Sequence, residues 1–132
     1  MVLSHTALFV GLLTYAHVFL TFWVGNYRRV TGILFQHDND EVLLRRIRAH
    51  GNFTETVPIT LIAMAVAELG GAPSWLLLTG GSALLLGRTA HVVALVRGGT
   101  GIGRAIGMLL TFGAMLLFAT YGLMIFGEAG VF

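Results

Sequence analysis

Ionisable and amide side chains recur at helical spacing inside apolar stretches of this sequence. Arg48, Asn52 and Glu55 stand four and three residues apart, so a helix places them on one face. Arg88 and His91 share a face of a later apolar stretch in the same way. A charged group within a membrane-spanning helix costs about 2.5–3.5 kcal/mol and by default marks a functional site. We therefore treat these residues as candidates for binding a polar ligand.

Two interpretations of these groups remain open from the residues alone. Glu55 could neutralise Arg88 across a helix bundle as part of a structural network, or the set could face a polar ligand. One carboxylate can serve both roles. His17 stands alone in an earlier apolar stretch and is predicted to be a core residue. No set of His, Asp and Glu has the spacing of metal ligands, so no metal site is predicted.

The composition indicates a membrane protein. Of 132 residues, 56% are hydrophobic and 11% are charged, against about 25% charged in soluble domains. Cysteine is absent, which excludes a disulfide framework, a thiolate metal site and a cysteine nucleophile. Any thiol chemistry must therefore come from a bound ligand. All eight basic residues are arginines, scattered among apolar stretches, a pattern that argues against nucleic-acid binding.

Four apolar stretches approach the length of about 20 residues that a membrane-spanning helix needs. We predict an all-α, integral membrane four-helix bundle in a single domain over residues 1–132. Asp38 and Glu41 have the spacing of a capping box for the second helix. Gly70 to Pro73 predicts a tight turn, and Pro58 predicts a bend. The expected helices span residues 3–25, 40–69, 74–96 and 104–126.

The arginines also predict an orientation in the membrane. Seven of them lie at or near two connections, residues 27–48 and 97–104, and the third connection has none. Because cytoplasmic loops carry the excess of basic residues, we expect both basic connections to face the cytoplasm. Both chain termini are then expected on the outer side.

The polar residues resemble a family signature. Residues 48–58, RAHGNFTETVP, resemble the R-A-x-x-N-x-x-E-x-x-P signature in helix two of the MAPEG family, the membrane-associated proteins in eicosanoid and glutathione metabolism. Residues 87–91, GRTAH, resemble the G-R-x-x-H segment of the third helix. The distance from His91 to Arg104 suits the arginine that family members place at the start of helix four. The resemblance covers nearly the whole chain.

The resemblance implies a homotrimer that holds glutathione between neighbouring subunits near the cytoplasmic side of a bacterial inner membrane. Arg104 would approach the glutathione sulfur as the catalytic residue. An arginine or a helix N-terminus lowers the pKa of a thiol, and thiolate is the nucleophile. The implied glutathione-binding residues are Arg28, Arg29, Arg48, Asn52, Glu55, Arg88 and His91.

The activity expected from this resemblance is that of a glutathione-dependent transferase or peroxidase. Its substrates would be apolar electrophiles or lipid hydroperoxides that arrive from the bilayer, and its other partner is membrane lipid. The alternative is a catalytically silent member that binds a small ligand or acts as a structural subunit. Leu95, which stands where well-studied members carry tyrosine, and Gly51 favour that alternative, and the Arg48, Asn52, Glu55 and Arg104 set favours the enzyme.

Overall fold

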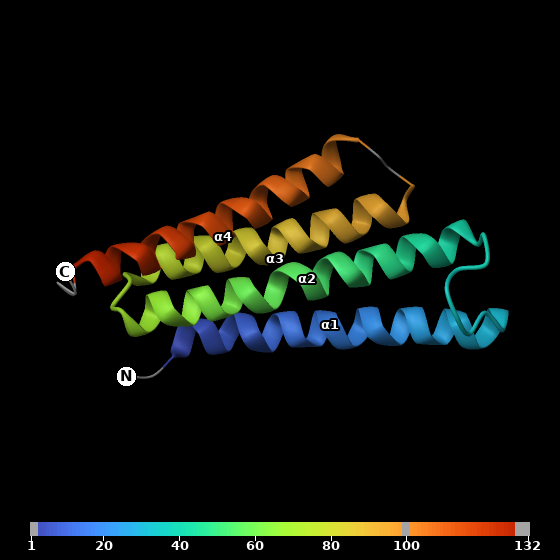
Figure 1. Ribbon diagram of the computed structural model, residues 1–132, viewed down its shortest axis with the longest axis horizontal. Helices are drawn as coiled ribbons and strands as arrows, with labels where there is room; N and C mark the ends of the chain where they lie inside the picture. The colour runs from blue at the N-terminus through green and yellow to red at the C-terminus, as the bar shows by residue number, and fades with distance from the viewer. Residues whose placement is uncertain (1–2, 99–100, 129–132) are drawn as a thin grey trace.

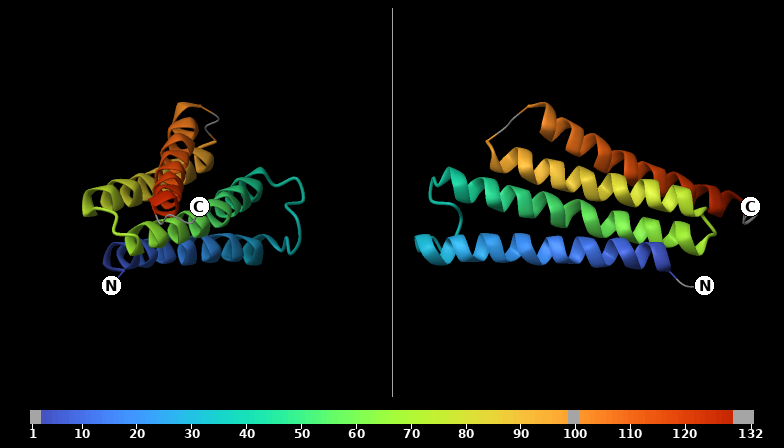
Figure 2. Two further views of the ribbon diagram at one scale, coloured as in Figure 1. Left: turned by 60° about the vertical axis from the view of Figure 1, so that its left-hand side comes forward. Right: turned by 180° about the vertical axis from the view of Figure 1, so that it is seen from behind.

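The computed structural model describes residues 3–98 and 101–128, which form helices only, as the sequence predicts. Successive helices run antiparallel, α1 pairs with α2, and α3 pairs with α4 (Figure 1). Views from other sides show that α4 crosses over α3 while α1 and α2 stay side by side (Figure 2). The helices are α1 (Ser4–Thr31), α2 (Glu41–Leu69), α3 (Ser74–Val96) and α4 (Ile102–Glu128).

The connection from α1 to α2 differs from the predicted capping box. Asp40 is the N-cap of α2, and its side chain accepts a hydrogen bond of 2.8 Å from the backbone N–H of Leu43. Tyr27 of α1 donates its hydroxyl to the same carboxylate at 3.1 Å. Asp38 has a φ of +46° and lies in the turn before the helix. The predicted pairing of Asp38 with Glu41 is therefore wrong, because the chain is still turning at Asp38.

Helix α1 continues six residues beyond its predicted end at residue 25 and ends at Thr31. Arg28 and Arg29 occupy its last turn, where their positive charges interact favourably with the negative end of the helix dipole. Gly32 follows with a φ of +74° and donates its N–H to the carbonyl of Arg28. The predicted end came from hydropathy, which indicates where a helix leaves lipid. The helix itself continues beyond that point, so its end was predicted too early.

The start of α1 is held by a residue of another helix. The structure shows no side-chain cap from Leu3. Instead, Glu68 near the end of α2 accepts the backbone N–H of His5 at 2.9 Å and that of Thr6 at 2.8 Å. The ring of His5 also lies 2.9 Å from the same carboxylate. Glu68 thus satisfies donors that a helix N-terminus leaves free and ties α1 to α2.

The tight turn between α2 and α3 is confirmed. Gly71 has a φ of +84°, and the N–H of Ala72 reaches back to the carbonyl of Ala67 at 2.9 Å. Pro73 is the residue before α3 and not part of its first turn, and α2 continues through Pro58 without a break. Helix α4 begins two residues before the predicted 104. Residues 99–100 of the predicted glycine-rich turn lie outside the described residues, as do the termini, 1–2 and 129–132, that we expect on the outer side.

Glycines bring α3 and α4 into close contact. A Cβ atom placed on Gly87 would lie 2.9 Å from the carbonyl oxygen of Gly107, and one on Gly107 would lie 2.8 Å from that of Gly87. Each of these glycines ends a pair of small residues four apart, Ala83/Gly87 and Gly103/Gly107, a spacing that is typical of close helix packing in membranes. The core on the inner faces is apolar, with Phe118 and Leu84 fully enclosed.

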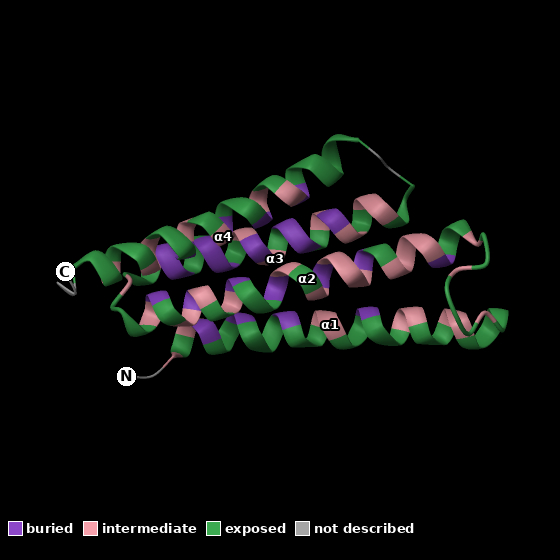
Figure 3. Ribbon diagram, in the orientation of Figure 1, coloured by how far each residue is buried: buried purple, intermediate pink, exposed green. Residues whose placement is uncertain are grey.

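Exposed residues follow the outer faces of the helices along much of their length (Figure 3). Many of them are large hydrophobic residues, among them leucines, valines and phenylalanines. Helices α1, α3 and α4 are long and apolar enough to cross a membrane. Among the described residues α2 does not meet that criterion, although it lies within the same bundle. An apolar exterior of this kind suits lipid as the solvent, and the chain is a membrane protein.

Candidate functional site

Arg88 of α3 lies at the centre of the polar cluster and is only 2% exposed. Its Nε donates to Thr111 Oγ1 of α4 at 2.9 Å. Its Nη1 donates to the backbone carbonyl of Asn52 at 3.1 Å and to Thr56 Oγ1 at 3.3 Å, both on α2. Its Nη2 has only the sulfur of Met108, at 3.6 Å. Arg88 therefore links three helices through neutral acceptors.

The expected neutralisation of Arg88 by Glu55 does not form. Glu55 is exposed on α2, and no carboxylate forms an ion pair with Arg88 within the described residues. The rotation of α2 about its axis explains this. It directs the backbone carbonyl of Asn52 toward Arg88 and places the side chain of Glu55 on the exposed face of the helix. A buried cation with only neutral acceptors pays a desolvation cost that the hydrogen bonds offset in part.

Asn52 and His91 connect the two sequence motifs. The Asn52 Nδ2 lies 3.1 Å from Nε2 of His91. Because an amide nitrogen is a donor, Nε2 of His91 accepts and its proton is assigned to Nδ1. His91 is 1% exposed, and its Nδ1 makes no hydrogen bond in the described part. The cluster thus extends from α2 to α3, where the backbone of His91 packs against Gly107 in the early part of α4.

The remaining motif residues are exposed at the same end of the bundle. Arg48 and Glu55 lie on the outer face of α2, and Arg104 lies in the first turn of α4. Their side chains make no hydrogen bond or ion pair within residues 3–98 and 101–128. Of the sequence candidates, the structure thus brings Asn52, Arg88 and His91 together and leaves Arg48, Glu55 and Arg104 free to meet a ligand.

Arg28 and Arg29 have partners near their own helix end. Nη1 of Arg28 donates to the carbonyls of Ile33 at 3.1 Å and Leu34 at 3.3 Å. Nη2 of Arg29 donates to Asn26 Oδ1 at 3.2 Å. Arg28 thereby holds the chain that leaves α1. Arg29 is exposed and has the weaker restraint.

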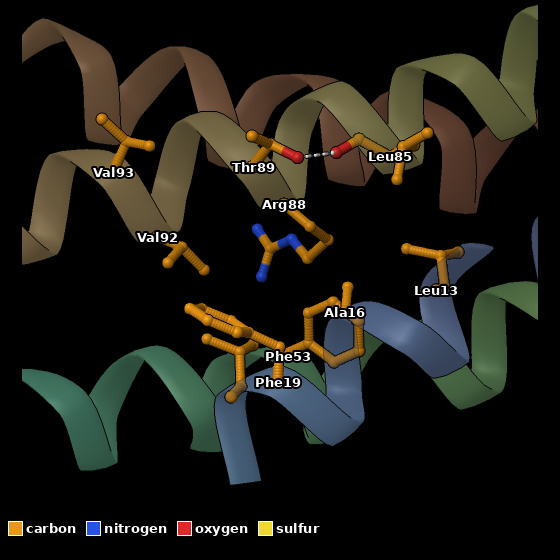
Figure 4. A pocket seen from close by; sticks show the side chains of 10 residues that line it. Leu13, Ala16, Phe19, Phe53, Leu85, Arg88, Thr89, Val92 and Val93 are labelled. Atoms are coloured by element: carbon orange, nitrogen blue, oxygen red, sulfur yellow. Dashed lines mark hydrogen bonds between the residues drawn. The ribbon is translucent and has the colours of Figure 1, made fainter. Parts of the chain in front are cut away.

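An apolar pocket of about 250 Å³ lies beside the buried arginine. It is lined by Phe19 and Leu20 of α1, Phe53 of α2, and Val92 of α3, with Arg88 at its wall (Figure 4). The guanidinium lies between α3 and the ring of Phe53. This arrangement offers apolar space beside a positive charge.

Sequence reasoning missed two contacts between α1 and α2. The guanidinium of Arg46 lies 4.3 Å from the ring centroid of Trp23 and 4.2 Å from that of Tyr27, a cation–π arrangement on two rings. His17, predicted to stand alone, lies beside His50 with ring centroids 5.1 Å apart. Spacing along one helix carries no signal for these contacts, because they depend on the register between two helices.

Comparison with known proteins agrees with the motifs. The family model described as "MAPEG family" matches residues 6–124. The Inner membrane protein YecN of Escherichia coli strain K12 is 42% identical over 45 residues, and YecN of strain CFT073 matches equally. The match spans 34% of this chain and 34% of each relative, about a third of their length. No solved structure matches significantly. Since the family model covers nearly the whole chain, this protein belongs to the MAPEG family.

Proposed function

We propose that this protein is a glutathione-dependent transferase or peroxidase that acts on apolar electrophiles or lipid hydroperoxides. The observation that carries the proposal is the hydrogen bond between Asn52 and His91. It joins the two motifs at the end of the bundle where Arg48, Glu55 and Arg104 are exposed. A tripeptide with two carboxylates, an ammonium group and amides requires this mixture of cations, carboxylate and amide.

Each exposed group has a chemical complement in glutathione. Arg48 suits a carboxylate and Glu55 suits the ammonium group. Asn52 is half-buried and its Nδ2 is held by His91, so only its Oδ1 is left to accept a peptide N–H. Arg88 is too enclosed to reach a ligand on the outer face of α2, so we assign it a positioning role. Its bond to the Asn52 carbonyl fixes this part of α2 against α3.

Arg104 is the proposed catalytic residue. A free thiol with a pKa of about 8.5 is mostly protonated at neutral pH, and a guanidinium or a helix N-terminus stabilises the thiolate. Arg104 lies in the first turn of α4, and its side chain has no partner among residues 3–98 and 101–128, so it can supply both effects. The thiolate sulfur would then bond to the electrophilic carbon of an apolar substrate as its leaving group departs. With a hydroperoxide, the sulfur would bond to the terminal oxygen as the O–O bond breaks, and the alkoxide would take up a proton and leave as the alcohol. A second glutathione would convert the resulting sulfenic acid to glutathione disulfide and water.

The α2 face also supports self-association. Along its exposed face Arg48 and Glu55 are followed by Ile59 and Ile62, which are 53% and 60% exposed. A carboxylate on a face turned to lipid is unfavourable. We propose that copies of this chain cover the face as a homotrimer and that glutathione binds between them.

The arginines at the proposed site also support an orientation. Arg28 and Arg45 flank the first connection, in the helices on either side of it, and the next connection on that side lies between Arg97 and Arg104. We propose that the membrane is a bacterial inner membrane. By the positive-inside rule this end of the bundle then faces the cytoplasm. Glutathione would reach the site from that side, and apolar substrates would reach it from the bilayer.

A catalytically silent, ligand-binding or structural member is the second candidate. Leu95 favours it, because this residue follows His91 by one helical turn and is half-buried without a hydroxyl to offer a sulfur. The internal hydrogen bonds of Arg88 also show that this part of the motif serves the fold.

Unfolding in detergent with and without glutathione tests the proposal. A ligand at 100 times its Kd adds about 2.7 kcal/mol of stability, and we expect Arg48→Ala to remove the shift. The ultraviolet absorbance of bound thiolate tests Arg104: its pKa should rise in Arg104→Ala and stay the same in Arg97→Ala, an exposed arginine in the same connection. No stability shift at millimolar glutathione would favour the silent member.

A further inference from the structure

His17 and His50 form a pair outside the proposed glutathione site. His17 belongs to α1 and His50 to α2, and their ring centroids are 5.1 Å apart with the planes tilted by 38°. Phe53 of α2 also lies beside His17, with a centroid separation of 5.8 Å. Both imidazoles are partly exposed. The rings are therefore held side by side and remain reachable from outside the core.

The hydroxyl of Thr21 fixes the tautomer of His50. Thr21 Oγ1 donates its single proton to the carbonyl of His17 at 2.9 Å. The same oxygen lies 3.0 Å from Nε2 of His50, so it must accept a proton from that nitrogen. Neutral His50 therefore carries its proton on Nε2 and a free lone pair on Nδ1. A histidine that ligates a metal usually donates its other N–H to such a partner, which sets the ring orientation.

The separation of the rings fits two ligands of one ion. With Zn–N bonds of about 2.0–2.1 Å and tetrahedral angles, the centroids of two ligating imidazoles lie about 5 Å apart. Imidazole nitrogen is a preferred ligand of zinc, copper and nickel. A groove of about 260 Å³ lies beside His17; apart from His17, Thr14 and Thr54, its lining is apolar. It leaves space on the His17 side of the pair for a ligand from outside the chain.

We propose that His17 and His50 bind one divalent first-row transition metal ion, with Zn²⁺ in a tetrahedral arrangement as the best fit. Nδ1 of His50 and one ring nitrogen of His17 are the protein ligands, and water completes the coordination. Thr21 is a positioning residue that acts through His50. This inference does not depend on glutathione binding, because the proposed metal ligands are not among the residues assigned to glutathione.

The test uses the full-length, tag-free protein in non-ionic detergent without glutathione. Co²⁺ is titrated while its visible absorption is followed, and Zn²⁺ is then added to displace it. We expect one ion per chain in the wild type and in His37→Ala, a matched histidine variant outside the pair. His17→Ala and His50→Ala should lose this binding, and Thr21→Val should weaken it by about 10–100-fold.

A second measurement keeps the proposal testable if an alanine variant does not fold. Cu²⁺ bound to the wild type should show two nitrogen donors in its electron paramagnetic resonance spectrum. His17→Gln and His50→Gln should reduce the number of donors to one or abolish the signal of the bound ion. Binding that is equal in wild type and both histidine variants would overturn the proposal, as would a wild type that binds no Co²⁺ at millimolar concentration.

Discussion

Replacing Gly107 with alanine tests whether α3 and α4 are as close as the structure shows. A Cβ atom at residue 107 would lie 2.8 Å from the Gly87 carbonyl oxygen, 2.8 Å from the backbone nitrogen of His91 and 2.9 Å from the Cβ of His91. Two of these three atoms belong to backbone and cannot move by a change of rotamer. The helices must therefore separate by roughly half an ångström to accept one methyl group. Atoms in a close-packed interior rarely lie nearer to each other than van der Waals contact.

The magnitude follows from two opposing terms. Overpacking costs about 1–3 kcal/mol, and two backbone contacts place this variant at the upper end. Alanine in a helix gains about 1 kcal/mol over glycine. Gly113→Ala on the same helix is the matched control, because nothing lies within 4 Å of its added Cβ. The propensity term cancels between the two variants, so Gly107→Ala should be less stable than Gly113→Ala by about 3 kcal/mol.

Reversible unfolding in mixed detergent micelles, followed by the helical circular dichroism signal, measures this difference. The free energy of unfolding is compared for the wild type, Gly107→Ala and Gly113→Ala at the same micelle composition. A difference below about 0.5 kcal/mol between the two variants would refute the reasoning, because surface substitutions away from such contacts stay within that range. The helices would then be farther apart than the structure has them.

Three further changes have defined outcomes. Glu68→Gln should lower the free energy of unfolding by about 2 kcal/mol, because charged hydrogen bonds contribute about 1.5–3 kcal/mol. The control is Glu41→Gln, which should cost under about 0.5 kcal/mol because the Glu41 side chain is 72% exposed. Equal losses of the two variants in chemical unfolding would contradict the role of Glu68 at the start of α1. The hydrogen bond from the backbone N–H of Leu43, and after it the one from the Tyr27 hydroxyl, hold the pKa of Asp40 below its usual range. The ionised Asp40 carboxylate therefore contributes to the stability of the folded state at pH values above its unfolded pKa. This contribution is lost as the pH falls through its folded pKa. The hydrogen-exchange protection factors of the amides in the first turn of α2 should therefore fall in acid, and this dependence should disappear in Asp40→Asn. Arg88→Met should keep the helical signal but abolish the stability shift with glutathione, and an unchanged shift would remove Arg88 from its positioning role.

Helix-level features were predictable from the sequence because they depend on local chemistry. Residues 74–96 form one helix as expected, since an apolar stretch is bounded by Pro73 and by Arg97 with Gly98. The spacing of Asn52 in one motif and His91 in the other predicted two polar faces, and the structure joins them. Periodicity determines which residues share a face, and the short turn at Gly71 makes α2 and α3 neighbours.

The partners of individual side chains were not predictable in the same way. Asp38 and Asp40 both satisfy the composition of a helix cap, and only the backbone path of the turn makes Asp40 the cap. Glu55 has the charge to pair with Arg88, yet the rotation of α2 turns it outward and presents the Asn52 carbonyl instead. His17 meets His50 through the register of α1 against α2. Rotation and register are set by the packing of the whole bundle.

The position of Glu55 relates ligand binding to assembly. Placing a carboxylate in lipid costs about 2.5–3.5 kcal/mol at the bilayer centre, a large fraction of a typical stability of about 5–15 kcal/mol. Glu55 lies in the first turn of the apolar part of α2, is exposed, and has no partner among residues 3–98 and 101–128. The bundle can avoid this cost by covering the face with protein or with a polar ligand. A cationic ligand group between two copies of the chain would do both at once, so ligand binding and self-association should strengthen each other.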